Sequence, residues 1–128
     1  MIVKTHDGFF HADDVFACAI LNLTFTDPEI VRDSSLTEYN LAIDVGGVYD
    51  GVRHFDHHQV DFNVAYPDGK LKASCGLVWA AFGKQLIAEV FRPEADIVDA
   101  VHTRIGNSDI RSIDLDDNGR HLPLDVCT

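Results

Sequence analysis

The sequence predicts an α/β domain with a mostly parallel central sheet flanked by helices. Several short segments, such as Leu41–Val45 (LAIDV), are rich in apolar residues that do not alternate with polar ones. This pattern is typical of strands buried on both faces of a parallel sheet. Longer segments with helical spacing of apolar residues separate or follow these strands, which favours an α/β architecture. The chain has 128 residues, so we expect a single domain spanning residues 1–128.

The first half of the chain is expected to supply the strands and one helix. Strands are predicted at Ile2–His6, Glu29–Arg32, Leu41–Val45 and Val52–Phe55. A helix is predicted at His11–Leu23, with a core face made of Val15, Phe16, Ala19, Ile20 and Leu23. Asp13 and Asp14 fall in its first turn, where negative charge suits the helix dipole.

The second half is expected to be helical. Pro67-Asp68-Gly69 predicts a turn, because proline presets one backbone torsion and glycine supplies the next. Ser74 then resembles the N-cap of a helix that runs to about Phe91. Pro93 opens a further helix that Gly106 is expected to close, and a last short helix is predicted at about residues 109–116.

Charge and hydropathy exclude several classes of function. The formal net charge is −11, which argues against a broad surface for long nucleic acids but allows small phosphorylated substrates. No apolar run is long enough to span a membrane, so no membrane partner is expected. The N-terminus lacks the layout of a signal or transit peptide, and we therefore expect a cytoplasmic protein.

Polar residues follow three of the predicted strands. They are His6, Asp44 and the cluster Asp56, His57 and His58 in the stretch HFDHHQ. In open α/β sheets, sites form in the crevice at the carboxyl ends of the strands. Mixed histidine and aspartate ligands suit manganese, iron or zinc, whereas calcium prefers oxygen ligands alone.

The candidate ligands are more numerous than one ion needs. The set is His6, His11, Asp13, Asp44, His57 and one later aspartate. Such a set would hold two ions about 3.5–4 Å apart, which is the spacing of two-metal hydrolases. In these centres a metal-activated water attacks phosphorus in line, and no serine or cysteine nucleophile is required.

The motifs together resemble the DHH phosphoesterase superfamily. The matching segments are THDGFFHADDVFACAIL (5–21), IVRD (30–33), AIDVGGVYD (42–50), FDHHQ (55–59), KLKASCGLVWAAFG (70–83) and IDLDDNG (113–119). Their order and content are most similar to one branch, the melanocyte proliferating gene protein family of metal-dependent hydrolases. The resemblance covers nearly the whole chain, and it implies a DHH-type metal-binding domain.

This resemblance also implies roles for individual residues. His6, His11 and Asp13 correspond to first-motif metal ligands, Asp44 to a bridging carboxylate, and His57 to a further ligand. His58 would face the substrate phosphate, so Asp44, His57 and His58 form the expected catalytic set. The fourth-motif ligand is Asp117 or Asp114, with preference for Asp117. Asp56 and Asp14 are expected to hydrogen-bond to metal ligands and orient them, without binding metal themselves. The spacing of the first motif, however, leaves open whether Asp13 or Asp14 is the metal ligand.

Four residues are expected to contact the substrate phosphate. His58 is the first of them. Ser74 and Gly76 open a predicted helix whose free N–H groups are suited to an anion. Arg53, just before the histidine cluster, is a further candidate, with a surface salt bridge as the alternative.

The leading functional hypothesis is a metal-dependent phosphoesterase that cleaves phosphodiester bonds of short RNA or nucleotides, in the manner of an exonuclease. The expected cofactor is a pair of Mn²⁺ ions, with Mg²⁺, Fe²⁺ or Zn²⁺ as alternatives. Relatives continue into a second domain that grips the substrate, and we expect this domain to be absent here. The alternative hypothesis is therefore a non-catalytic metal- or nucleotide-binding remnant. A homo-oligomer that closes the site from a neighbouring subunit is a further candidate.

Overall fold

The computed structural model describes residues 1–119 of the chain. Four strands and four α-helices appear in it, with one π-helical turn between the last two helices. The elements are β1 (Ile2–Thr5), α1 (Ala12–Thr24), β2 (Glu29–Arg32), β3 (Leu41–Ile43), β4 (His54–Phe55), α2 (Ser74–Phe91), α3 (Ala95–Ile105), the π-helical turn (Gly106–Ile110) and α4 (Arg111–Gly119).

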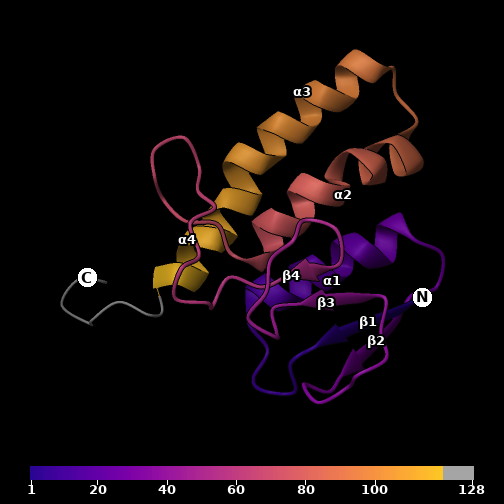
Figure 1. Ribbon diagram of the computed structural model, residues 1–128. Helices are drawn as coiled ribbons and strands as arrows, with labels where there is room; N and C mark the ends of the chain where they lie inside the picture. The colour runs from indigo at the N-terminus through magenta and orange to yellow at the C-terminus, as the bar shows by residue number, and fades with distance from the viewer. Residues whose placement is uncertain (120–128) are drawn as a thin grey trace.

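The four strands form one parallel sheet in the order β2-β1-β3-β4 (Figure 1). This confirms the predicted fold class of an α/β domain with a parallel sheet. Each strand lies at a predicted place, although β4 is limited to His54 and Phe55. Because all strands run the same way, their carboxyl ends meet at one edge of the sheet.

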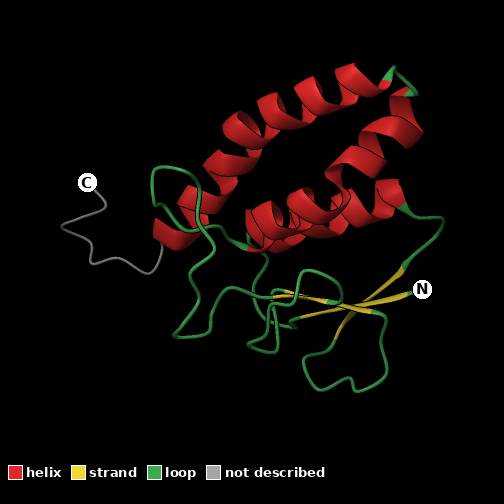
Figure 2. Ribbon diagram, turned by 45° about the horizontal axis from the view of Figure 1, so that its top comes forward, coloured by secondary structure: helices red, strands yellow, loops and turns green. Residues whose placement is uncertain are grey.

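The helices gather on one side of this sheet, as both ribbon views show (Figures 1 and 2). Val3 and Thr5 of β1 are fully buried, whereas Lys4, between them in sequence, is only half-buried. The Lys4 ammonium lies 4.9 Å from the centre of the Tyr39 ring, and Tyr39 belongs to the loop between β2 and β3. This loop therefore contacts the face of β1 opposite to Val3 and Thr5.

The core lies between the sheet and the pair α1 and α2. Val3, Ile43 and Phe55 contribute from the strands, with Leu21 from α1 and Leu77 from α2, and all five are essentially inaccessible to solvent. Full burial of such side chains contributes about 1.5–3 kcal/mol each. This core fixes the two helices whose first turns form one wall of the site described below.

The predicted core face of α1 is wrong, with the exception of Ile20. The exposed fractions of Val15, Phe16 and Leu23 are 45%, 49% and 58%. The buried positions are instead Asp13, Asp14, Ala17, Cys18, Ile20, Leu21 and Thr24. The helix is rotated so that its two aspartates point inward, toward the carboxyl ends of the strands. Hydrophobic spacing alone missed this, because the polar side chains and not the largest apolar ones determine the rotation.

The predicted end of a helix at Gly106 agrees with the structure, in which α3 ends at Ile105 and Gly106 is its C-cap, but the backbone does not leave the helical conformation there. Gly106 has right-handed helical torsions, and the chain continues through the π-helical turn directly into α4. A Cβ atom at Gly106 would lie 3.2 Å from the Trp79 indole nitrogen. Glycine is therefore used here for close contact with a side chain of α2, and not for the left-handed torsion that ends many helices.

Within residues 1–119, no helix combines the length and the apolar character that crossing a lipid bilayer requires.

Candidate metal centre

The site is assembled at the carboxyl edge of the sheet from five segments. His6 directly follows β1, Asp44 directly follows β3, and His57 lies two residues after β4. The first turn of α1 adds Asp13 and Asp14, and α4 adds Asp117. All of these carboxylates are buried. Buried carboxylates are stable only with hydrogen bonds, opposite charge or a metal ion, so their partners determine what the site can do.

The backbone at Asp44 is shaped for this position. Asp44 has a φ of 58°, in the left-handed region that few residues other than glycine adopt. Gly47, also with positive φ, donates its N–H to Asp56 at 2.7 Å. The Ser74 hydroxyl donates to Asp44 Oδ1 at 3.1 Å. Uncommon torsions of this kind cluster at functional sites, where surrounding contacts hold them in place.

One group of candidate ligands surrounds the Nε2 atom of His57. We call Asp13, His57 and Asp117 the Asp117 group. The Nε2 atom lies 3.1 Å from Asp117 Oδ2, 3.4 Å from Asp13 Oδ2 and 3.2 Å from Asp44 Oδ1. It is buried, yet none of the residues described makes a hydrogen bond of good geometry with it. A divalent cation would satisfy this nitrogen and the oxygens around it at once, so these residues fit a metal ion.

A second group lies on the other side of Asp44. We call His6, Asp14 and Asp44 the His6 group. His6 Nε2 is 3.2 Å from Asp44 Oδ2 and 3.4 Å from Asp14 Oδ2. In each of the two groups, the potential ligand atoms lie within 4.8 Å of one another. Asp44 therefore presents one oxygen to each group, which is the arrangement of a bridging carboxylate.

His11 lies at the margin of this arrangement. It is the residue before α1, and its backbone N–H donates to Asp14 Oδ1 at 2.7 Å. Its Nδ1 atom is 4.0 Å from Asp117 Oδ1, and its ring centre is 6.2 Å from that of His6. The structure thus places His11 beside both groups. It is in none of the three groups of potential ligands found in the described residues, the third being Asp44, His57 and His58.

The electrostatics of the centre favour a cation. Burial by itself opposes charge on His57, but the carboxylates of Asp117, Asp13 and Asp44 raise the His57 pKa to about 12. Burial raises the pKa of Asp13 to about 6, against the lowering effect of His57. The centre therefore holds a proton tightly on His57 when no metal is bound. The same negative field attracts a divalent ion that displaces the proton.

Asp56 organises the neighbouring residues. Its Oδ1 accepts the His57 N–H at 2.9 Å and contacts His58 Nδ1 at 2.7 Å. This contact is the largest cause of the raised pKa of His58. The His58 side chain is 46% exposed and its Nδ1 lies 3.6 Å from Asp44 Oδ1, so it stands at the solvent side of the centre. Asp56 thus holds the ring of His58 by this contact.

The N–H groups at the start of α2 are not free, in contrast to the expectation for Ser74 and Gly76. The N–H of Ser74 donates to Asp13 Oδ2 at 3.3 Å, and the N–H of Cys75 donates to Asp13 Oδ1 at 2.6 Å. The N–H of Gly76 donates to Asp114 Oδ1 at 2.9 Å. These three N–H groups therefore bind carboxylates of the protein itself, whereas a substrate phosphate was expected to bind there.

Arg53 is the second correction. It precedes β4, so it lies at the amino end of that strand, whereas the acidic residues gather at the carboxyl edge. Its guanidinium donates to the Tyr39 carbonyl oxygen at 2.7 Å and stacks over the Tyr39 ring at 4.6 Å. The position of Arg53 in the sequence suggested proximity to the histidines, but two strand residues separate it from the site.

The structure separates the two fourth-motif candidates. Asp117 reaches His57, as preferred, whereas Asp114 accepts hydrogen bonds from the Tyr66 hydroxyl at 2.5 Å and from Gly76. Burial raises the pKa of Asp114 to about 7, although both hydrogen bonds act to lower it. For the first motif, both Asp13 and Asp14 point into the centre, one in each group.

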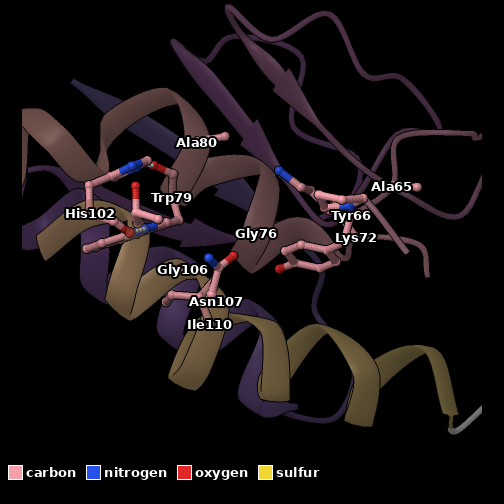
Figure 3. A pocket seen from close by; sticks show the side chains of 12 residues that line it. Ala65, Tyr66, Lys72, Gly76, Trp79, Ala80, His102, Gly106, Asn107 and Ile110 are labelled. Atoms are coloured by element: carbon pink, nitrogen blue, oxygen red, sulfur yellow. Dashed lines mark hydrogen bonds between the residues drawn. The ribbon is translucent and has the colours of Figure 1, made fainter. Parts of the chain in front are cut away.

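A cavity of about 220 Å³ adjoins the first turns of α2 (Figure 3). Trp79 and His102 lie on one side of it, and Tyr66 lies on the other. The Trp79 and His102 rings are stacked, with centres 5.1 Å apart. Gly76 is the one residue lining this cavity that the sequence indicated as part of the site. The cavity and the acidic centre are therefore neighbours that share the start of α2.

Two residues that hold aspartates of the expected ligand set were missed by sequence reasoning. The Arg32 guanidinium donates to Asp14 Oδ2 at 2.9 Å and lies 3.9 Å from the Phe10 ring centre. Tyr66 holds Asp114, as described above. The sequence could have indicated Arg32, because this residue ends β2 and therefore lies at the same edge of the sheet as His6. Tyr66 carried no such signal.

Comparison with known proteins supports a family assignment. A family model described as "Uncharacterised protein family (UPF0160)" matches residues 2–125. The chain is 35% identical to the MYG1 protein of Dictyostelium discoideum over 98% of its length. It is 33% identical to the MYG1 exonuclease of Homo sapiens, and equally to that of Mus musculus, over 91% of its length.

The matched region is only part of each relative. The chain spans 41% of the Dictyostelium protein and 35% of the human protein. No solved structure gives a significant match. Since the family model covers nearly all of the sequence, and the relatives match across nearly the same span, the chain belongs to the melanocyte proliferating gene (MYG1) protein family.

Proposed function

We propose that this chain is a metal-dependent phosphoesterase that cleaves phosphodiester bonds of short RNA or nucleotides. The observation that carries the proposal is the buried His57 Nε2 atom, which has carboxylate oxygens of three aspartates within 3.4 Å and no hydrogen bond among the residues described. A divalent ion bound to this nitrogen would also be coordinated by the surrounding carboxylate oxygens, which supports a metal site here.

Two ions would be held by the two groups defined above, with Asp44 between them. Mn²⁺ is the preferred ion, because mixed imidazole and carboxylate ligands suit it, and Mg²⁺, Fe²⁺ and Zn²⁺ remain alternatives. When bound, a pair of such ions supplies an activated water and stabilises charge on the attacking and leaving oxygens of a phosphoryl group.

The protein's own residues would position the substrate and the ligands. His58, which is half-exposed and held by Asp56, would contact a substrate phosphate at the mouth of the centre. Ser74 fixes Asp44, and the start of α2 fixes Asp13. These contacts are made before substrate arrives, so less reorganisation is required at the moment of reaction.

The substrate class follows from charge and from the relatives. A net charge of −11 disfavours extended tracking of a nucleic-acid backbone, which supports a short oligonucleotide or a nucleotide as substrate. Relatives in Homo sapiens, Mus musculus and Rattus norvegicus carry the name MYG1 exonuclease, which supports phosphodiester hydrolysis. Because the chain spans less than half of those proteins, activity of this region on its own is part of the proposal.

The test combines metal content with turnover. After Mn²⁺ loading and desalting, elemental analysis should find about two ions per chain, and the loaded protein should release nucleotides from end-labelled short RNA. Asp44→Ala and His57→Ala should lose bound metal and turnover while keeping the circular dichroism spectrum of the parent protein.

Three outcomes would be decisive. Mn²⁺-dependent hydrolysis retained in both variants would overturn the site assignment. Two bound ions without turnover on RNA, dinucleotides or pyrophosphate would overturn the enzymatic part and leave a metal-binding module. Absence of bound metal in the parent protein would overturn the centre itself.

A further inference from the structure

The loop between β4 and α2 contains a short hairpin that lies beside α4 (Figure 1). We call residues 65–72 the hairpin. Ala65 and Leu71 form an antiparallel bridge, and Tyr66 and Lys70 are joined by a backbone hydrogen bond of 2.9 Å. Its tip is the predicted Pro67-Asp68-Gly69 turn, where Gly69 has a φ of 89°. The hairpin is therefore a locally closed structure and not an extended connection.

Three contacts join this hairpin to α4. Arg111 donates to Asp68 at 2.5 Å, and the Tyr66 hydroxyl donates to Asp114 at 2.5 Å. The Asn118 side-chain amide donates to the Leu71 carbonyl oxygen at 2.8 Å. The three α4 positions follow the i, i+3, i+7 spacing of a single helix face. Together these contacts fix the rotation of α4 about its axis.

Asp114 also ties α4 to α2. Its Oδ1 accepts the N–H of Gly76 at 2.9 Å, and neither Asp114 nor the first turn of α2 is open to solvent. A Cβ atom at Gly76 would clash with Asp114 Oδ2 and lie 3.0 Å from the Tyr66 hydroxyl oxygen. Only glycine leaves room for this approach. Tyr66, Gly76 and Asp114 therefore form a closed, buried contact, which we call the latch.

The latch lies one helical turn from a candidate metal ligand. Asp117 follows Asp114 by three residues in α4, and its Oδ2 is 3.1 Å from His57 Nε2. A change in the rotation of α4 would move Asp117 away from His57, because α4 is the last helix described and reaches the centre through this side chain. The oxygens of Asp114 are used by the latch, and Asp114 is in none of the candidate ligand groups found in residues 1–119.

We propose that Tyr66 is a positioning residue that acts through Asp114 to hold Asp117 against His57, and thereby sets the affinity of the Asp117 group for a divalent cation. The inference rests on the proposed metal centre, and it adds that the two ions depend differently on Tyr66. Loss of the latch weakens the ion bound by the Asp117 group and leaves the ion bound by the His6 group unchanged, because no latch residue contacts His6 or Asp14.

The test is Mn²⁺ binding to the full chain by isothermal titration calorimetry. Tyr66→Phe removes only the hydroxyl that Asp114 accepts from. We expect it to weaken one of the two ions about tenfold, which is the lower range for loss of a group that orients a ligand. Tyr39→Phe is the matched control, because its hydroxyl contacts His54 at 3.1 Å, away from the carboxyl edge of the sheet. It should leave both affinities unchanged.

A second substitution separates positioning from direct ligation. Asp114→Asn keeps an oxygen for the Gly76 N–H and offers an amide to the Tyr66 oxygen, so it should bind both ions with nearly parental affinity. Asp114→Ala should reproduce the loss caused by Tyr66→Phe. A loss in Asp114→Asn as large as in Asp114→Ala would show that Asp114 acts through its charge and would overturn the latch.

A metal-free crystal structure of Tyr66→Phe gives a readout that does not depend on the ions. It should show Asp117 displaced from His57 Nε2 relative to 3.1 Å in the parent. An unchanged Asp117 position, or unchanged Mn²⁺ affinities in Tyr66→Phe, would overturn the latch while leaving the centre in place. If the parent chain binds no Mn²⁺, the proposed centre fails, and the latch is then judged on the Asp117 position alone.

Discussion

His57 Nε2 lies 3.1 Å from Asp117 Oδ2, so the segment after β4 and the last described helix meet at one point of the sheet edge. Each residue is buried, and each has further acidic neighbours. The contact concentrates negative charge around one imidazole. Its physical consequence is that the folded state should respond strongly to any species that brings positive charge to this point.

Divalent metal should therefore raise thermal stability. A ligand that binds only the folded state adds about 2.7 kcal/mol at a concentration one hundred times its Kd. We expect Mn²⁺ to raise the Tm of the parent chain by several degrees in differential scanning fluorimetry, and EDTA to reverse the shift. His57→Ala should show a clearly smaller shift, because it removes the imidazole ligand of the Asp117 group. Ca²⁺ is the control ion, because it prefers oxygen ligands alone and should shift the Tm much less. Equal shifts with both ions would contradict an imidazole ligand.

Without metal, stability should fall as pH rises from about 4 to 8. Asp13 and Asp114 have folded pKa values raised to about 6 and about 7, above the usual value of about 3.9 in an unfolded chain. The folded state thus binds more protons than the unfolded state in this window, and stability is lost as pH rises. His57, with its pKa raised to about 12, continues the trend above pH 6.5. The pKa values of Asp56 and Asp117 are lowered in the folded state, so their contribution to stability is lost only below about pH 4. These two residues therefore oppose the trend only at the acidic end of the range.

Urea unfolding in EDTA, measured in steps from pH 4 to 8, tests whether the free energy of unfolding falls as the pH rises. Asp114→Asn removes one of the two raised carboxyl groups, so its free energy of unfolding should depend less steeply on pH between 4 and 7. Saturating Mn²⁺ should reverse the trend, because metal binding releases protons and strengthens with pH. Stability that rises with pH in metal-free protein would contradict the protonated His57 at the centre.

The sequence predicted the site better than it predicted the helix faces. His6, Asp44 and His57 could be placed together because strand ends in a parallel sheet share an edge, which is a property of topology and needs no side-chain detail. The rotation of α1 could not be read from its apolar residues, since burial of Asp13 and Asp14 leaves Phe16 half-exposed.

Other differences between expectation and structure have a common physical origin. Gly106 and Arg53 were interpreted from local sequence, but each is placed by a partner far along the chain, Trp79 and Tyr39 respectively. Tyr66 was missed for the same reason, because its hydroxyl meets Asp114, which is distant in sequence. Contacts of this kind become visible only once the fold brings the segments together.

Gly83 should be intolerant of a side chain. A Cβ atom there would lie 2.6 Å from Trp79 Cδ2 and 2.9 Å from His102 Cδ2, so alanine must displace two stacked rings. Those rings are further held by the Trp79 indole N–H, which donates to the His102 carbonyl oxygen at 3.1 Å. Overpacking of this kind typically costs about 1–3 kcal/mol, and the better helix propensity of alanine offsets about 1 kcal/mol.

Chemical denaturation of Gly83→Ala should therefore show a net loss of up to about 2 kcal/mol in the free energy of unfolding. Gly119→Ala is the control, because a Cβ atom there would meet nothing within 4 Å. It should change stability by less than about 0.5 kcal/mol. A Gly83→Ala variant as stable as the parent would mean that the Trp79 and His102 pair can shift without loss.

The Arg32 and Asp14 pair should show strong energetic coupling. Asp14 is fully buried, and its Oδ2 accepts from the Arg32 guanidinium at 2.9 Å, so removing the cation leaves a buried carboxylate with weaker compensation. Arg32 is partly exposed and solvent screens the pair, so we expect Arg32→Met to lower the free energy of unfolding by about 1–3 kcal/mol. Asp14→Asn in the Arg32→Met background should recover much of that loss, because the unpaired charge is then gone.

A double-mutant cycle in EDTA measures this coupling without interference from metal. Arg53→Met, at a guanidinium that contacts only the Tyr39 carbonyl and ring among the partners identified, is the control and should show no coupling to Asp14→Asn. Coupling near zero between Arg32 and Asp14 would mean that His6 or water satisfies Asp14 in solution. Coupling above about 1 kcal/mol would identify Arg32 as the residue that holds the Asp14 carboxylate in place beside His6.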